Sequence, residues 1–226
     1  MVNGIDVSKW QGSGTDFWQV KTAGIDFVII RAGLGRLASQ KDPCFEQNYK
    51  KAVAAGLKVG AYWYSYANSA DDAVREAKAC LEVIKGKKFD YPIYFDLENK
   101  WQFLLGKKFC SKLVEAFCST LENAGYFAGL YMSRWYLQNY ITPEVARRYA
   151  VWVADYNSKC KYNGAYGIWQ YSSKGSIAGV KGDVDLDIAY IDYPKIIRRE
   201  GLNGFKTVEQ LANEVLNDEW GKGSER

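Results

Sequence analysis

The feature that most constrains the fold of this chain is a repeated alternation of short apolar runs with helical segments. Each apolar run is continuous rather than interleaved with polar residues, which is typical of strands covered on both faces, as in a parallel sheet. The runs that predict strands are Ile5–Val7, Phe27–Ile30, Leu57–Tyr66, Tyr91–Leu97, Tyr126–Met132, Val151–Ala154, Gly167–Tyr171 and Val184–Leu186.

Helical patterns separate the earlier strands and become scarce later in the chain. They are predicted at Phe17–Ala23, Phe45–Ala55, Ala70–Ile84 and Lys107–Asn123. Ser69 is placed to cap the third of these helices, and Gly56 is placed to end the second. After residue 125 the last strands are joined by loops rich in Gly, Ser, Asn and Tyr.

This order of elements predicts an α/β protein, an irregular β/α (TIM-like) barrel with eight strands and fewer helices. The alternative is an open doubly wound sheet, but no glycine-rich phosphate-binding loop follows the first strand. A chain of 226 residues is long enough for one large domain with an appendage.

The sequence changes character after Pro194, which predicts a division of the chain. We expect a barrel domain over residues 1–194, a linker over 195–206 and the start of a second module over 207–226. Thr207 and Gln210 form a capping box that begins a new helix with one apolar face. A piece of this length cannot bury a core of its own.

Composition excludes several classes of chemistry. The chain has no histidine, which removes Ser-His-Asp and Cys-His mechanisms and most zinc hydrolases. The net charge of +4 is small and forms no basic stripe, so no nucleic-acid partner is expected. The five cysteines include no CxxC pair, which indicates free, buried thiols. Neither a signal peptide nor an apolar run long enough to span a membrane is found, so we expect no membrane partner.

Acidic residues stand at the ends of predicted strands. Asp96 and Glu98 are two residues apart at the end of the fourth strand, so their side chains share a face. In a parallel barrel the carboxyl ends of the strands form the active-site rim. Asp6 ends the first strand and Asp185 lies in the eighth, and these strands are neighbours in a closed barrel. The four acids are therefore expected to meet in one cleft.

A cluster of carboxylates points to acid–base chemistry. Mutual repulsion and an apolar neighbourhood raise the pKa of at least one of them, which leaves a protonated acid beside ionised partners. Glycoside hydrolysis uses such a pair, because the acid protonates the leaving oxygen and a carboxylate supports the developing positive charge. A bound metal ion is the rival interpretation, but neither a phosphate-binding loop nor EF-hand spacing accompanies the acids. We expect no metal and no cofactor.

Eight short motifs occur in an order that resembles one known family. They are Gly4–Ser8 with Trp10, Ile30–Gly33, Gly60–Tyr64, Tyr94–Glu98, Leu130–Tyr131, Val151–Ala154, Ile168–Tyr171 and Val184–Asp187. Together they resemble the glycoside hydrolase family 25 muramidases, the Chalaropsis-type lysozymes of phage endolysins and bacterial autolysins, over about residues 3–193. The tail from Thr207 to Arg226 resembles, in part, the opening of a Cpl-7-type cell-wall-binding repeat.

The resemblance implies an N-acetylmuramidase that cleaves the β-1,4 bond between N-acetylmuramic acid and N-acetylglucosamine. Glu98 then corresponds to the general acid/base, Asp96 and Asp6 to its partner carboxylates, and Asp185 to a fourth acid in the cleft. Family members are usually discussed as substrate-assisted, and a covalent intermediate is the open alternative. The residues expected to bind substrate are Arg31, Tyr62, Tyr64, Tyr131, Trp152, Gln170 and Trp10. For Arg31 we favour a role in holding a carboxylate ionised over a contact with the lactyl group of muramic acid.

Two other functions compete with this interpretation. One is an inactive barrel that only binds peptidoglycan, and the other is a different carbohydrate hydrolase, such as a chitinase-like enzyme. The expected partner is bacterial peptidoglycan, and the expected state is a monomer or weak oligomer. Because no signal peptide is recognised, we expect synthesis in the bacterial host cytoplasm and action on the cell wall after release by phage or prophage lysis.

Overall fold

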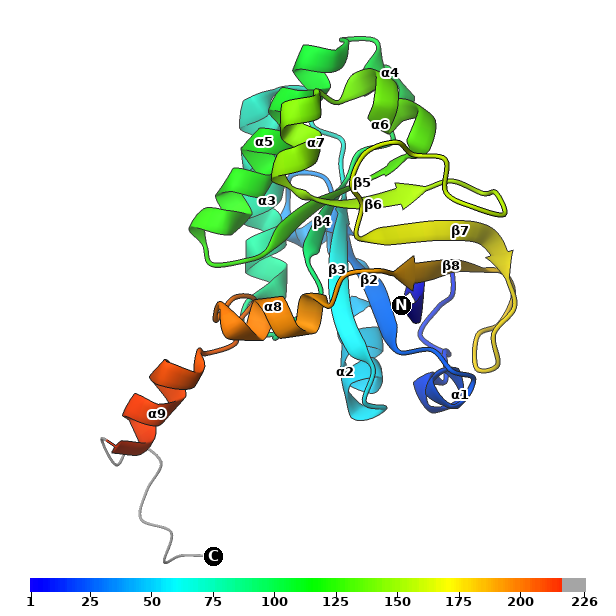
Figure 1. The fold of residues 1–226 in the computed structure, drawn as a ribbon, viewed down its shortest axis with the longest axis vertical. Helices are drawn as coiled ribbons and strands as arrows, with labels where there is room; N and C mark the ends of the chain where they lie inside the picture. Colours follow the sequence, from blue (N-terminus) through cyan, green and yellow to red (C-terminus); the bar gives the residue numbers. More distant parts are fainter. Residues whose placement is uncertain (217–226) are drawn as a thin grey trace, which may run out of the picture.

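The structure, a computed structural model, describes residues 1–216 and contains a closed barrel of eight strands in sequential order (Figure 1). The strands are β1 (Val2–Val7), β2 (Phe27–Leu34), β3 (Lys58–Tyr64), β4 (Ile93–Asp96), β5 (Ala128–Ser133), β6 (Ala150–Ala154), β7 (Ile168–Gly175) and β8 (Val184–Ala189). The predicted α/β barrel is thereby confirmed. Strands β1 to β7 pair in parallel, but β8 is antiparallel to both β7 and β1, unlike the all-parallel sheet that the continuous apolar runs favoured.

Helices follow each of the first five strands, and the last two described helices follow β8 (Figure 1). They are α1 (Phe17–Thr22), the 3₁₀ helix η1 (Ala38–Gln40), α2 (Phe45–Ala54), α3 (Ala70–Ile84), α4 (Lys100–Phe103), α5 (Lys107–Asn123), α6 (Arg134–Tyr140), α7 (Pro143–Arg148), α8 (Tyr193–Arg199) and α9 (Val208–Leu216). Within the described chain no helix separates β6 from β7 or β7 from β8, so the expected loss of helices is confined to the last two connections. No helix in residues 1–216 combines the length and apolar character needed to cross a bilayer.

The long helices follow from local sequence signals, whereas the short ones depend on tertiary contacts. Helix α3 begins where Ser69 Oγ accepts a hydrogen bond from the Asp72 amide at 3.1 Å, as its capping pattern predicts. The short helices α4, α6, α7 and α8 were not expected. Phe103 of α4 stacks on Tyr136 of α6 with ring centroids 3.8 Å apart, so packing stabilises segments too short to be helical alone.

Two apolar cores lie on opposite sides of the sheet. In β4, Ile93 and Phe95 face the outer core beneath the helices, while Tyr94 faces the barrel interior. The alternation places Asp96 on the inner side as well. The inner core contains Phe27, Ile29, Tyr91, Tyr94, Trp152, Ile168, Ala189, Tyr193 and Ile197.

Glycine makes room for the large rings inside the barrel. A Cβ atom on Gly4 would lie 2.2 Å from the ring of Phe27, and one on Gly129 would lie 2.6 Å from the ring of Tyr94. Neither distance is compatible with a side chain. The pairing of small with large residues therefore fills the barrel with aromatic groups and gives the site at its end a rigid floor.

Residues 195–206, expected as a linker, pack against the barrel instead. Helix α8 buries Ile197, and the following turn buries Asn203. The Asn203 side chain donates to the carbonyl oxygens of Phe89 and Tyr91 at 3.1 and 2.9 Å and accepts from the Phe127 amide at 2.7 Å. Sequence signals for flexibility missed this contact because it joins positions far apart in the chain. The rest of the predicted tail, residues 217–226, lies outside the described residues.

A buried glutamate supports the loop between β3 and α3. Glu76 of α3 has no solvent-exposed surface, and its Oε1 accepts a hydrogen bond from the Tyr66 amide at 2.7 Å. Burial raises the pKa of the Glu76 carboxyl to about 7, against the lowering effect of hydrogen bonds from Ser65 and Tyr66. The loop thus depends on a carboxyl group that is neutral over much of the acidic range.

We expect Asn203→Ala to lower the free energy of unfolding by about 2–3 kcal/mol, because it leaves two carbonyls and one amide without their buried partner. Asn203 also has a φ of 54°, which alanine adopts less readily. Chemical denaturation measures the change. Asn213→Ala, at an exposed position of α9, is the matched control. Equal stabilities for the two variants would show that Asn203 does not hold the segment.

We expect Glu76→Gln to become progressively more stable relative to the wild type as the pH rises from about 4.5 to about 7. The folded pKa lies above that of the unfolded chain, so the wild type loses stability across this window and levels off above it. The relative change should reach at most about 3 kcal/mol, at about 1.4 kcal/mol per pKa unit. Urea unfolding at a series of pH values tests this, with Glu82→Gln on the same helix as the control. A difference that does not vary with pH would contradict a buried neutral Glu76.

Candidate active site

The four acids predicted from the sequence lie at one end of the barrel. Asp6 near the end of β1 pairs directly with Asp185 near the start of β8. Because β8 is antiparallel, its first residues lie where β1 and β4 end. Asp96 is the last residue of β4, and Glu98 follows two residues later. The reversed strand therefore brings Asp185 to the rim that the parallel strands form.

Asp96 and Glu98 differ sharply in exposure. Asp96 is 3% exposed, the intervening Leu97 is buried in the outer core, and Glu98 is exposed. Burial raises the pKa of Asp96 well above its ordinary value, Glu98 raises it further, and Arg31 opposes the rise. The pKa of Glu98 is also raised, first by the protein that surrounds the carboxyl in the cleft and then by Asp185. Glu98 is thus an acid that solvent can reach and that keeps its proton to a higher pH than a free glutamate.

Asp6 is held by a chain of hydrogen bonds. Gln170 of β7 donates from Nε2 to Asp6 Oδ2 at 2.7 Å. The hydroxyls of Tyr131 and Tyr156 donate to Gln170 Oε1 at 2.8 and 2.9 Å, which fixes the orientation of the amide. Burial is the main cause of the raised pKa of Asp6, followed by the charges of Asp187 and Asp185. Tyr156, which was not expected at the site, is 55% exposed and stands at its rim.

A fifth acid, Asp187, lies behind the other four. Its side chain has no exposed surface, and Trp152 donates from Nε1 to its Oδ1 at 2.8 Å. Burial is the main cause of its raised pKa, the hydrogen bond from Trp152 opposes the rise, and the charge of Asp185 adds to it. Asp187 belongs to the quoted Val184–Asp187 motif but was not singled out. Its spacing of two residues from Asp185 could have placed it on the same face.

Arg31 holds a carboxylate, but its direct partner is one that sequence reasoning missed. Its Nε lies 2.7 Å from Asp42 Oδ2, and a terminal nitrogen lies 2.6 Å from the same oxygen. Both side chains are buried. Asp42 also accepts from the amides of Lys9 and Cys44, at 3.0 and 2.9 Å. The positive charge of Arg31 also lies close enough to Asp96 to lower the pKa of Asp96.

The aromatic residues expected to bind substrate separate into two groups. Trp152 is only 1% exposed and contacts Tyr62 and Tyr131 in the barrel, with ring centroids 6.1 and 4.4 Å away. A direct stacking role for Trp152 is therefore wrong, because its ring is covered. Tyr62, Tyr64 and Tyr131 are half-buried at the strand ends, and Trp10 is 77% exposed after β1.

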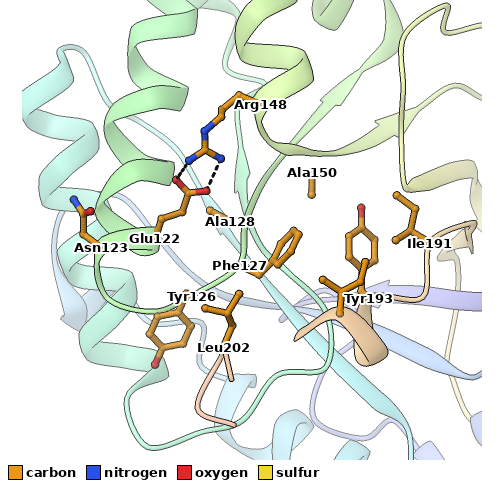
Figure 2. A pocket seen from close by; sticks show the side chains of 11 residues that line it. Glu122, Asn123, Tyr126, Phe127, Ala128, Arg148, Ala150, Ile191, Tyr193 and Leu202 are labelled. Atoms are coloured by element: carbon orange, nitrogen blue, oxygen red, sulfur yellow. Dashed lines mark hydrogen bonds and ion pairs between the residues drawn. The ribbon is translucent and has the colours of Figure 1, made fainter. Parts of the chain in front are cut away.

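Figure 2 shows a pocket of about 550 Å³. It lies where β5 and β6 begin, at the opposite end of the barrel from the acids. It is lined by the first residues of β5 and β6, the end of α5 and the segment around α8. Figure 2 shows Arg148 and Glu122 joined across its upper side, at 2.6 and 2.8 Å. Phe127, Tyr193 and Leu202 provide an apolar floor. Its lining includes none of the clustered acids, so size alone does not identify the functional site.

The five cysteines, all within residues 1–216, are free thiols, and Cys44 and Cys160 are half-buried rather than buried. Within the same residues, no group of three or more Cys, Asp or Glu side chains is arranged to hold a metal ion. The groups that the site presents are carboxyls, tyrosine hydroxyls and the Arg31 guanidinium, which is paired with Asp42.

Comparison with known proteins identifies the family. The chain matches the model of the glycosyl hydrolases family 25 over residues 5–180. It is 32% identical to the autolytic lysozyme of Clostridium acetobutylicum over 189 residues, which are 82% of this chain and 55% of that protein. The modular autolysin LytC from Streptococcus pneumoniae, solved with a synthetic peptidoglycan ligand, superposes with a TM-score of 0.75 at 28% identity over 84% of this chain.

A lysozyme from Streptomyces coelicolor shares the fold, with a TM-score of 0.71 and 24% identity over 87% of this chain and 95% of that protein. The chain spans about half the length of the clostridial lysozyme and 46% of the pneumococcal autolysin. The matched segment covers the barrel from β1 to the connection before β8 and includes Asp6, Asp96 and Glu98. The chain belongs to glycosyl hydrolase family 25.

Proposed function

We propose that this protein is a peptidoglycan hydrolase, an N-acetylmuramidase that cleaves the β-1,4 bond between N-acetylmuramic acid and N-acetylglucosamine. The observation that carries the proposal is the exposed Glu98 carboxyl, whose pKa is raised, beside the buried Asp96. The names of the clostridial lysozyme and the pneumococcal autolysin support the substrate class.

In this proposal Glu98 acts as general acid and then as general base. Its raised pKa keeps the proton available for the glycosidic oxygen at a pH nearer neutrality than a free glutamate allows. Once the bond has broken, the Glu98 carboxylate accepts a proton from the attacking water. An exposed position at the rim suits both steps, because leaving group and water must both reach the carboxyl.

Asp96, Asp6 and Asp185 assist from deeper in the cleft. Asp96 Oδ1 is buried and has no hydrogen-bond partner among the described residues. That oxygen is free to accept a hydrogen bond from substrate, such as the N–H of a 2-acetamido group that lies over it. In its ionised form Asp96 would stabilise a developing oxocarbenium ion, and Asp185 lies opposite Asp6 on β8.

The aromatic residues around the cleft would bind the sugar chain. Tyr62, Tyr64 and Tyr131 present half-buried rings at the strand ends, and Trp10 presents an exposed ring. Aromatic rings of this kind offer an apolar face to sugar carbons and a polar edge to hydroxyls. Gln170 is committed to Asp6, Tyr131 and Tyr156, so its contribution is to position these groups.

We expect Glu98→Gln to lower the rate of peptidoglycan cleavage by at least about 100-fold, the lower range for loss of a general acid, while the fold persists because Glu98 is exposed. Purified peptidoglycan is digested, the products are reduced with borohydride, and the reduced sugar is identified by mass spectrometry. The wild type should yield reduced muramic acid.

The matched control is Glu115→Gln, an exposed glutamate of α5. Unchanged cleavage by a folded Glu98→Gln variant would remove Glu98 from the acid role. Reduced glucosamine in place of reduced muramic acid would identify a glucosaminidase. The absence of a new reducing end in the wild type would leave a binding barrel.

We further propose that residues 207–226 contribute to binding of the cell wall. The buried Ile197 and Asn203 show that a deletion must begin after them. Removal of residues 207–226 should leave hydrolysis of soluble glycan fragments within about twofold and slow the lysis of whole cells several-fold, since only wall attachment is lost. Turbidity assays on whole cells measure the second effect. Equal lysis by both proteins would contradict the binding role.

A further inference from the structure

Asp6 and Asp187 are two buried acids that lie on neighbouring strands and point to the same side of the sheet, into the barrel. They come from adjacent antiparallel strands, where Asp6 pairs with Asp185 and Asp187 pairs with Gly4. Asp187 has no exposed surface, and Asp6 is 6% exposed. Both side chains point into the barrel, and the charge of Asp187 is the largest electrostatic contribution to the raised pKa of Asp6, so the two carboxyl groups lie close together. Two carboxyl groups can form a hydrogen bond with each other only when one of them carries a proton.

The other hydrogen bonds of the pair leave one buried oxygen, Asp187 Oδ2, without a donor among the described residues. Asp6 Oδ2 accepts from Gln170, and Asp187 Oδ1 accepts from Trp152. Asp187 Oδ2 is buried and receives no hydrogen bond from any N–H or O–H group of the described chain. A buried carboxylate oxygen without a donor is costly, and a proton shared with Asp6 removes that cost.

The charges around the pair also favour one proton. Asp185 lies beside both groups on β8, and Asp96 faces Asp6 from β4. The charge of Asp6 or Asp187 raises the pKa of five nearby tyrosines. These are Tyr62 of β3, Tyr94 of β4, Tyr131 of β5, Tyr156 after β6 and Tyr171 of β7. No lysine or arginine within residues 1–216 forms a salt bridge with either carboxyl, and the Arg31 of β2 is paired with Asp42. Two full negative charges would therefore be uncompensated.

We propose that Asp187 is a positioning residue that shares a single proton with Asp6 and so fixes the orientation and the charge of Asp6 in the cleft. The proposal rests on the proposed function for its catalytic consequence, but the shared proton itself is independent of any substrate. Asp187 is fully covered and cannot touch a sugar. It acts through Asp6, which lies between it and the cleft.

The network gives Asp6 a support on each side. The hydroxyls of Tyr131 and Tyr156 hold Gln170 so that its N–H faces Asp6. On the other side, the indole of Trp152 holds Asp187. The hydrogen bond to Asp187 explains why Trp152, whose ring is covered, lies close to the site. Trp152 orients Asp187, and Asp187 in turn orients Asp6.

The shared proton is tested by comparing the wild type with Asp187→Asn. The asparagine can accept from Trp152 and donate to Asp6, which then carries a full charge without a shared proton. The unfolded wild-type chain has both carboxyls ionised above about pH 5. The ratio of the unfolding equilibrium constants, wild type over Asp187→Asn, should therefore rise about tenfold per pH unit, or about 100-fold from pH 5 to pH 7.

A ratio that stays constant over this range would overturn the proposal, because either no proton is held or Asp6 holds it without Asp187. Glu76 is present in both proteins and cancels in the ratio. If Asp187→Asn does not fold, Asp6→Asn provides the same comparison from the other side, and the same two outcomes decide.

Enzyme kinetics test the positioning role. Asp187→Asn should lower kcat for cleavage of soluble peptidoglycan fragments by no more than about tenfold, whereas Asp187→Ala should lower it by at least about 100-fold with KM within about twofold. Alanine leaves Trp152 and Asp6 without their partner. Equal losses of kcat in the two variants would overturn the positioning role. A loss of activity that comes from a higher KM rather than a lower kcat would also overturn it. If the wild type shows no cleavage while the unfolding ratio rises as expected, the proposed function fails and the shared proton stands.

Discussion

The closure of the barrel by β8 is the constraint on which the site depends. A parallel eighth strand would carry its first residues to the opposite end of the barrel from Asp6 and Asp96. The antiparallel strand instead pairs Asp185 with Asp6 and sets Asp187 two residues further in. The connection from β7 to β8 is made without a crossover helix, which is possible because antiparallel neighbours need only a loop. The missing helix between β7 and β8 and the position of Asp185 in the acidic site therefore have the same structural cause.

The packing around the acids explains how the fold tolerates them. The outer core beneath α2, α3 and α5 is apolar and extends along the whole set of parallel strands, so it stabilises the barrel independently of the site. The inner core ends at the level of Tyr94 and Trp152, and the acids lie above it. Burial of the acids then costs free energy that the large outer core offsets, and that cost is reduced by the donors Gln170 and Trp152.

The sequence predicts those parts of the structure that local physics decides. Helix α3 starts at the residue after Ser69 because the cap and the apolar face agree, and Asp96 shares its inward side with Tyr94 because strands alternate. The direction of β8 was not predictable, since a short apolar run carries no information on the orientation of its neighbours. Residues 195–206 read as a linker because Gly201 and Gly204 favour turns, and only the fold reveals the contacts of Asn203. The roles of Asp42 and Asp187 could not be predicted from the sequence either, because each depends on a partner far away in the chain.

A gradient of exposure across the acids orders their chemical roles. Glu98 is exposed, Asp6 and Asp96 are 6% and 3% exposed, and Asp187 is fully buried. Water stabilises charge, so the cost of ionisation increases along this series, while access to substrate decreases. The exposed acid can exchange its proton with substrate and water in each catalytic cycle. The buried acids exchange protons less readily and are better suited to holding a fixed protonation state and a fixed geometry. Burial by the strands therefore divides one group of similar side chains into a proton carrier and its electrostatic support.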